Sequence, residues 1–221
     1  MPHFSRPFRE KWEYDTADLK VNSPQSPYMR RILVLLLLTS FVAAQSNLAH
    51  QKYEQSLREI DNHKYTKAEK LLRDVITETP NWSLAYATLG RLYFLWPKPP
   101  SAIAAYERAR ELDLADHQLT PDQRHDVNDN LGVLYGLAKQ YDKSVSVLES
   151  AIKDDPAFGE YEYNLACDFS ELGDLDKALT HLQRAYALRN TFKFPDPKED
   201  DSFKQWRTND RFTEAVSKMM N

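Results

Sequence analysis

The side chains best placed for chemistry are one imidazole and three carboxylates that follow one another at short intervals. Asp122, His125, Asp126 and Asp129 are separated by spacings of three, four and seven residues, so they would share one face of a helix. Such a face can bind a metal ion or a basic partner. A hard metal ion needs more converging oxygens than one helix face supplies. We therefore interpret this acidic face as solvated surface, with a metal- or ligand-binding protein that uses it as the alternative.

The remaining reactive residues form no catalytic pattern. The six histidines are scattered, and His117 and His125, the one near pair, are expected at the surface. The single cysteine, Cys167, has no partner for an internal disulfide and no basic neighbour in sequence to lower the pKa of its thiol. The sequence also lacks a phosphate-binding glycine loop, a nucleophile-elbow serine and a His-Glu-x-x-His motif. We therefore predict a non-enzymatic protein with no cofactor and no bound metal, and an uncharacterised enzyme on the same scaffold is the alternative.

The charge of the chain argues against a nucleic-acid partner. The 221 residues include 29 Lys and Arg against 33 Asp and Glu, for a formal net charge of −4. Proteins that bind DNA or RNA usually present a basic face to the phosphates, and no stripe of Lys and Arg runs along the expected helices. We predict a protein or peptide partner and no nucleic acid.

Small residues recur at a fixed interval in two separate columns of the sequence. Both columns advance in steps of 34 residues, with one step of 42 where eight residues are inserted. Two columns with the same steps predict a helical repeat, in which small residues let helix axes approach to about 8 Å. The columns are Ala68, Ala102, Ser144 and Ala178, and then Gly90, Gly132 and Ala166.

The residues around these columns resemble the tetratricopeptide repeat over about residues 49 to 190. The resemblance implies an all-α fold, a right-handed superhelical solenoid of about four antiparallel helix pairs with capping helices at its C-terminal end. The clearest copy reads Tyr86-x2-Leu89-Gly90-x2-Tyr93 and then Ala102-x3-Tyr106-x2-Ala109. The pairs are expected near residues 49–82, 83–116, 125–158 and 159–190, the insertion near 114–124 and the cap over 191–221.

Local signals refine the expected helix ends. Thr120-Pro121-Asp122-Gln123 is a capping box with proline at the first helical position, so it predicts a helix from about Pro121 to Ala138. The inserted residues should lengthen this helix and form a loop before it. The prolines after Trp96 predict a stiff turn before a helix that begins near Ser101. His63 occupies the turn position at which Gly173 stands in the last copy.

The segment after the last repeat is expected to cover the open end of the array. Its apolar residues have the spacing of an amphipathic cover, whereas Arg207, Asp210 and Arg211 are expected to form local ion pairs. The covering residues are Phe203, Trp206, Phe212, Ala215, Val216 and Met219.

The resemblance also implies a binding surface, because tetratricopeptide arrays bind peptides or proteins on the concave face lined by the first helix of each pair. Asn130 and Asn164 could hydrogen-bond a peptide backbone or serve the packing of the helices, and both interpretations are kept. A lysine and arginine clamp for a terminal carboxylate is not expected, since Tyr53 and Leu57 stand where it would begin. The predicted partner-binding residues are Leu84, Arg91, Phe94, Asp129, Asn130, Val133, Tyr163, Asn164 and Cys167.

The N-terminal segment predicts export. Met29-Arg30-Arg31 is followed by an apolar run from Ile32 and by small residues, which is typical of a signal peptide over residues 29–44 with cleavage after Ala44. The run is shorter than the ~20 residues that span a bilayer, so no stable membrane insertion is expected. Residues 1–28 are expected to be an extension ahead of a true start at Met29. The prediction is a periplasmic or secreted interaction scaffold of the cell envelope, and a self-associating structural repeat protein is a further alternative.

Overall fold

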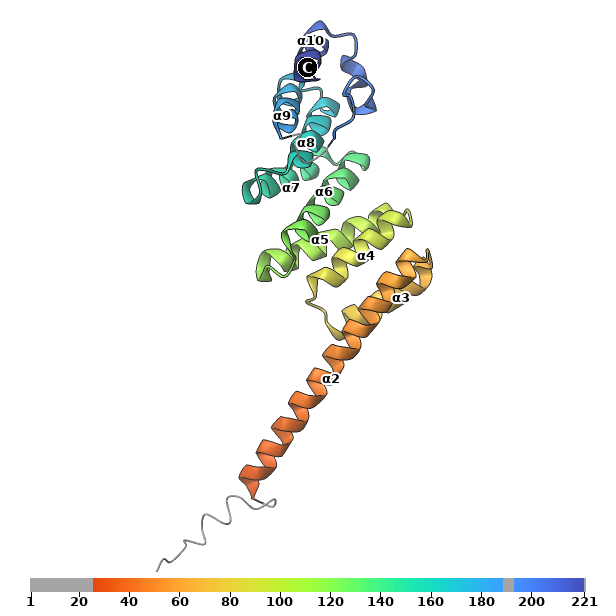
Figure 1. The fold of residues 1–221 in the computed structure, drawn as a ribbon, viewed down its shortest axis with the longest axis vertical. Helices are drawn as coiled ribbons and strands as arrows, with labels where there is room; N and C mark the ends of the chain where they lie inside the picture. Colours follow the sequence, from red (N-terminus) through yellow and green to blue (C-terminus); the bar gives the residue numbers. More distant parts are fainter. Residues whose placement is uncertain (1–25, 189–192, 221) are drawn as a thin grey trace, which may run out of the picture. The chain divides into compact units, whose positions relative to one another are not determined.

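The computed structural model of the 221-residue chain describes residues 26–188 and 193–220, without the side chains of residues 40–45. The expectations for residues 1–25 and for the junction at 189–192 lie outside the described residues. All regular structure in the described part is helical (Figure 1). The elements are α2 (Pro27–Asp61), α3 (Tyr65–Glu78), α4 (Ser83–Leu95), α5 (Pro99–Asp116), α6 (Pro121–Leu137), α7 (Tyr141–Asp154), α8 (Gly159–Glu171), α9 (Leu175–Ala187), the short 3₁₀ helix η1 (Asp201–Trp206) and α10 (Asp210–Met220).

The chain divides into two compact units, residues 1–48 and 49–221. In the first unit, α2 continues through the predicted cleavage site at Ala44 without a break, and the large side chains from Leu33 to Leu38 are exposed. In the described residues no helix is both long enough and apolar enough to cross a membrane. The signal peptide and its cleavage stay predictions.

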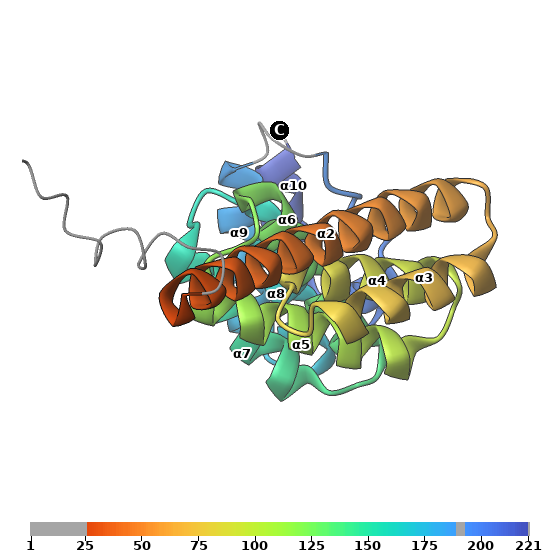
Figure 2. The ribbon, with the colours of Figure 1, turned by 90° about the horizontal axis from the view of Figure 1, so that it is seen from below.

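The second unit is a stack of antiparallel helix pairs. α4 packs on α5, α6 on α7 and α8 on α9, and Figure 2 shows α4 and α5 side by side. The C-terminal part of α2 pairs with α3, to which it is joined by ion pairs of Lys52 with Glu78 and of Glu59 with Lys67. This architecture confirms the predicted all-α repeat solenoid.

Three of the turns inside the helix pairs have a residue in the left-handed conformation at the same position. His63, Lys139 and Gly173 all adopt positive φ, of 56°, 58° and 80°, so the left-handed turn residue is glycine in only one of the three. Pro97 holds the equivalent position in the second pair, where a proline ring fixes φ at a negative value. The helix after it begins at Pro99, two residues earlier than predicted, because proline is tolerated in the first turn of a helix, where backbone N–H groups need no helical partner.

The insertion lengthens two helices, not one. α5 has 18 residues against 14 in α3, and α6 has 17 against 13 in α4, so the prediction that the added residues lengthen only the helix after the loop was incomplete. The predicted capping box is present: the Thr120 hydroxyl accepts from the Gln123 amide, and the Gln123 side chain accepts from the Thr120 amide. Buried Asp113 fixes the loop by accepting hydrogen bonds from Arg124 and from the Leu119 amide, at 2.6 and 2.7 Å.

The two glycines of the small-residue column are required to different degrees. A Cβ on Gly90 would lie 2.7 Å from the ring of Tyr106, which is 2% exposed, and a Cβ on Gly132 would lie 2.7 Å from a methyl group of Leu148. The rigid ring has no room to move, whereas the end of a leucine side chain can change its rotamer.

Gly90→Ala should therefore lower the free energy of unfolding by about 1–3 kcal/mol, the usual cost of overpacking. Gly132→Ala should be close to neutral, since the gain in helix propensity of about 1 kcal/mol offsets a small shift of Leu148. Urea denaturation followed by circular dichroism measures both. Equal effects of the two substitutions would show that the Tyr106 ring does not set the distance between α4 and α5.

The C-terminal segment caps the stack as predicted, although its first element is a 3₁₀ helix. Phe203, Phe212 and Val216 are fully buried against α8 and α9, and Trp206, Ala215 and Met219 pack around them. Arg207 pairs locally with Asp201 at 3.2 Å, whereas Arg211 pairs with Asp176 of α9, so only the first of these ion pairs is local.

The buried apolar residues of the second unit form two clusters. One extends from Tyr53 to Val147, and the other extends from Leu148 to Val216. The division therefore falls between two neighbouring residues of α7, which contributes side chains to both.

Candidate peptide-binding surface

The first helices of the pairs lie next to one another, since α4 contacts α6 and α6 contacts α8. Their exposed side carries two hollows. The α4–α6 hollow, of about 220 Å³, also includes Tyr53 and Leu57 of α2. The α6–α8 pocket, of about 300 Å³, is closed on one side by Asp200 and Ser202 of the capping segment.

The predicted partner-binding residues divide between these two hollows. Two of the nine line neither: Phe94 is 40% exposed on α4, and half-buried Asp129 lies between α6 and α8, where it bonds to Asn164. Leu84, Arg91 and Asn130 line the α4–α6 hollow, and Val133, Tyr163, Asn164 and Cys167 line the α6–α8 pocket.

The two asparagines use amide hydrogens within the protein. Asn130 donates to the carbonyl of Asp126, and Asn164 donates to the Asp129 carboxylate, both at 2.7 Å. These contacts favour the structural interpretation of both residues. Burial, with the nearby charge of Glu160, raises the pKa of Asp129 to about 6 in spite of the Asn164 hydrogen bond.

Cys167 faces the α6–α8 pocket in an environment that suppresses thiolate formation. Burial raises the pKa of its thiol, and the neighbouring charge of Asp200 raises it further. A reactive nucleophile needs the opposite shift. The side chain serves as a small apolar part of the pocket wall.

The acidic face of α6 does not gather as the sequence suggested. His125 turns away from the neighbouring carboxylates to Asp155, at 2.7 Å, and stacks on Phe158 with ring centroids 4.1 Å apart. Within the described part of the chain, no three His, Cys, Asp or Glu side chains are placed to hold a metal ion. The alternative metal- or ligand-binding site at this face would therefore lack its imidazole, because His125 contacts Asp155 and Phe158 instead.

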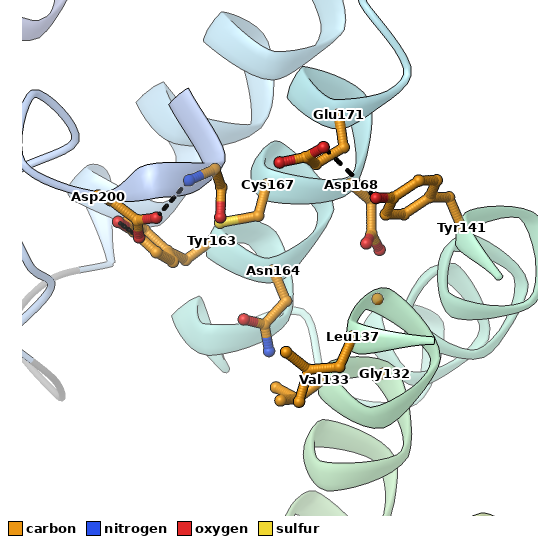
Figure 3. Close-up of a pocket in the computed structure, with 12 residues that line it drawn as sticks. Gly132, Val133, Leu137, Tyr141, Tyr163, Asn164, Cys167, Asp168, Glu171 and Asp200 are labelled. Atoms are coloured by element: carbon orange, nitrogen blue, oxygen red, sulfur yellow. Dashed lines mark hydrogen bonds between the residues drawn. The ribbon is translucent and has the colours of Figure 1, made fainter. Parts of the chain in front are cut away.

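Carboxylates dominate the α6–α8 pocket instead, and sequence reasoning missed all three of them. Asp200 accepts from the Tyr163 hydroxyl at 2.8 Å, and Glu171 accepts from the Tyr141 hydroxyl at 3.4 Å (Figure 3). The third is Asp168, which is 4% exposed and whose Oδ2 has no hydrogen-bond partner among the described residues. Burial raises the pKa of Asp168 to about 7, with only a partial offset from the Ser144 hydroxyl.

The missed residues left little signal in the sequence. Asp168 follows Asn164 by one helical turn on the face already identified, so the periodicity of α8 could have included it. Gly136 also follows Gly132 by one turn, which indicates space on that side of α6. Asp200 and Ser202 could not be placed, because the capping segment has no repeat from which to align it.

These helix pairs, with small residues at their crossings and hollows on their first helices, form the tetratricopeptide-repeat fold. No family model matches the sequence, and neither does any curated protein. Solved structures of the same fold do match.

The structure described as MamA 41-end from Desulfovibrio magneticus RS-1 aligns with a TM-score of 0.60 at 20% identity, covering 78% of this chain and 93% of that chain. Another structure of MamA aligns with a TM-score of 0.58 at 20% identity, covering 69% and 85%. YrrB, described as a TPR protein with an unusual peptide-binding site, aligns with a TM-score of 0.55 at 17% identity, covering 79% and 91%. At these identities the likeness establishes the fold.

Proposed function

We propose that this chain is a non-enzymatic interaction scaffold that binds an extended peptide or protein segment along α4, α6 and α8. The observation that carries the proposal is the pair of hollows, of about 220 and 300 Å³, on consecutive first helices. Side-chain-sized hollows on successive repeats suit a partner that lies across the helices. YrrB, a TPR protein described as having an unusual peptide-binding site, supports this use of the fold.

We place this scaffold in the cell envelope. The support is the sequence pattern of residues 29–44, a short basic segment followed by an apolar run and small residues. The mature protein would begin at Gln45 and would contain every residue of the two hollows.

Peptides selected from a random display library against the full chain should lose at least about tenfold in affinity when Arg91→Ala and Val133→Lys are combined. Arg91→Ala removes the cationic side chain that lines the α4–α6 hollow, and Val133→Lys places a longer, positively charged side chain in the α6–α8 pocket, so each hollow loses contacts with the peptide. Fluorescence anisotropy with the labelled peptides measures the affinity.

Lys153→Glu, an exposed position on α7 of the opposite helix layer, is the matched control and should leave binding unchanged. Peptides that bind the double variant as tightly as the parent, with its helical circular dichroism intact, would exclude this surface.

A further inference from the structure

The α6–α8 pocket is acidic and contains no cation of its own among the described residues that line it. Two buried carboxylates of the described residues are each matched by a cation, Glu59 by Lys67 and Asp113 by Arg124, both at 2.6 Å. The pocket holds Asp168, Glu171 and Asp200, and no Lys, Arg or His is among the described residues that line it. No cation among these lining residues therefore compensates the negative charge.

Asp168 is the residue at which this imbalance is greatest. Its side chain is buried, and Oδ2 has no hydrogen-bond partner within the described residues. The nearby Ser144 hydroxyl donates to the carbonyl of Gly132 at 3.0 Å, and its contact with the Asp168 carboxylate offsets only part of the effect of burial. A buried carboxylate without a partner is costly, and a ligand that supplies the missing donor would remove that cost.

The wall opposite Asp168 is shaped to leave its carboxylate room. A Cβ on Gly136 would lie 3.2 Å from Oδ1, so any larger residue at this position of α6 would press on the carboxylate. Figure 3 shows the Asp168 carboxylate pointing from α8 toward α6, with Tyr141 beside it. The Asp168 carboxylate therefore lines the pocket, with Oδ1 next to Gly136 and the unpartnered Oδ2 buried behind it.

The other polar groups are held in place around the same space. Asp200 is fixed by the Tyr163 hydroxyl and by the Ser202 amide at 2.9 Å, and Tyr141 reaches Glu171 from α7. Aromatic rings next to carboxylates favour organic cations, which interact with both. A volume of about 300 Å³ exceeds what a bare metal ion needs, and no metal-binding group of three such side chains is present in the described residues.

We propose that the α6–α8 pocket binds the cationic side chain of a lysine or arginine in the partner, with Asp168 as its principal acceptor and Glu171 and Asp200 as further acceptors. This inference rests on the proposed function for the identity of the partner, since a basic side chain is delivered by a peptide that lies on this surface. It specifies the partner as a basic segment.

The pocket can be tested without any peptide. The ¹⁵N-labelled full chain is titrated with n-butylammonium and n-propylguanidinium chloride, which copy the ends of lysine and arginine, and with 1-butanol as the neutral probe at matched ionic strength. Saturable shifts of the amide signals around Gly136, Asp168 and Ser202 are expected with a cation and not with butanol.

Asp168→Asn should weaken this binding by about tenfold or more, because the amide keeps the shape of the side chain and removes its charge. Asp61→Asn, which changes an exposed carboxylate at the end of α2, is the matched control and should bind as the parent does. Equal shifts with butanol, or cation binding that Asp168→Asn leaves unchanged, would overturn the proposal.

Selected peptides separate this inference from the proposed function. Replacing the lysine or arginine of a selected peptide by norleucine should lower its affinity for the parent about tenfold and leave its affinity for Asp168→Asn unchanged. That result would support both the scaffold function and the cation pocket. In another outcome, the affinity of the peptides falls with the Arg91 and Val133 substitutions but changes neither with norleucine nor with Asp168→Asn. That result would support the scaffold function and refute the cation pocket. Cation binding that depends on Asp168, with no peptide selected, supports the pocket and refutes the peptide function.

Discussion

Phe203→Ala should lower the free energy of unfolding by about 3–5 kcal/mol, the range for removing a buried aromatic ring. Phe203 is fully buried and lies within 5.7 Å of the Phe212 ring and 6.2 Å of the Tyr163 ring, measured between centroids. Its loss leaves a cavity between the cap and α8 and loosens the cover of the last repeat, which repeat arrays need. Urea denaturation measures the change, and hydrogen exchange should show faster exchange of the amides of α8 and α9.

Phe94→Ala is the matched control for this substitution. It removes the same ring from a position that is 40% exposed on α4, so the expected cost is below about 1 kcal/mol. Similar losses from the two substitutions would show that burial under the cap contributes little to the stability of the array.

The protein should become less stable as the pH rises from about 5 to 8. Asp168 has a pKa of about 7 and Asp129 one of about 6 in the folded chain, against an ordinary value of 3.8. Between these limits the folded chain binds more protons than the unfolded chain, so the free energy of unfolding falls as the pH increases and levels off above the folded pKa values. The contribution of Asp168 is on the order of 3 kcal/mol.

Asp168→Asn separates this effect from the other titrations. The variant should be more stable than the parent at pH 8, closer to it at pH 5, nearly equal to it near pH 4, and less dependent on pH in between, as followed by urea denaturation at each pH. Asp61→Asn should follow the parent. A parent slope that persists in Asp168→Asn would mean that this carboxylate does not remain protonated in the folded chain.

The sequence was sufficient to predict the features that depend on the repeat pattern and on local helix signals. The spacing of the small residues located the helix pairs, and the capping box at Thr120 located the start of α6, because each depends on residues within one or two helical turns. The apolar spacing of the last segment also identified it correctly as a cap.

Features that depend on contacts between distant segments were not predictable in this way. Asp200 and Ser202 reach the α6–α8 pocket from the cap, and Asp155 comes from the end of α7 to take His125 away from the acidic face. The length of α5 was missed for a related reason, because the insertion carries no internal mark that shows where its residues are added. The predicted partner-binding residues were therefore expected on one face, whereas the structure divides most of them between two hollows.

The division of the apolar core within α7 bears on how cooperatively the array unfolds. Leu131, Leu134 and Tyr135 of α6 belong to the first cluster, whereas Tyr163 of α8, which lines the α6–α8 pocket, belongs to the second. Stability in a repeat protein is approximately the sum of terms for each repeat and each interface between neighbours, so a weak boundary lets the two parts open separately. A ligand seated between α6 and α8 strengthens that one interface by mass action. Binding there would thus couple the unfolding of the two clusters more tightly.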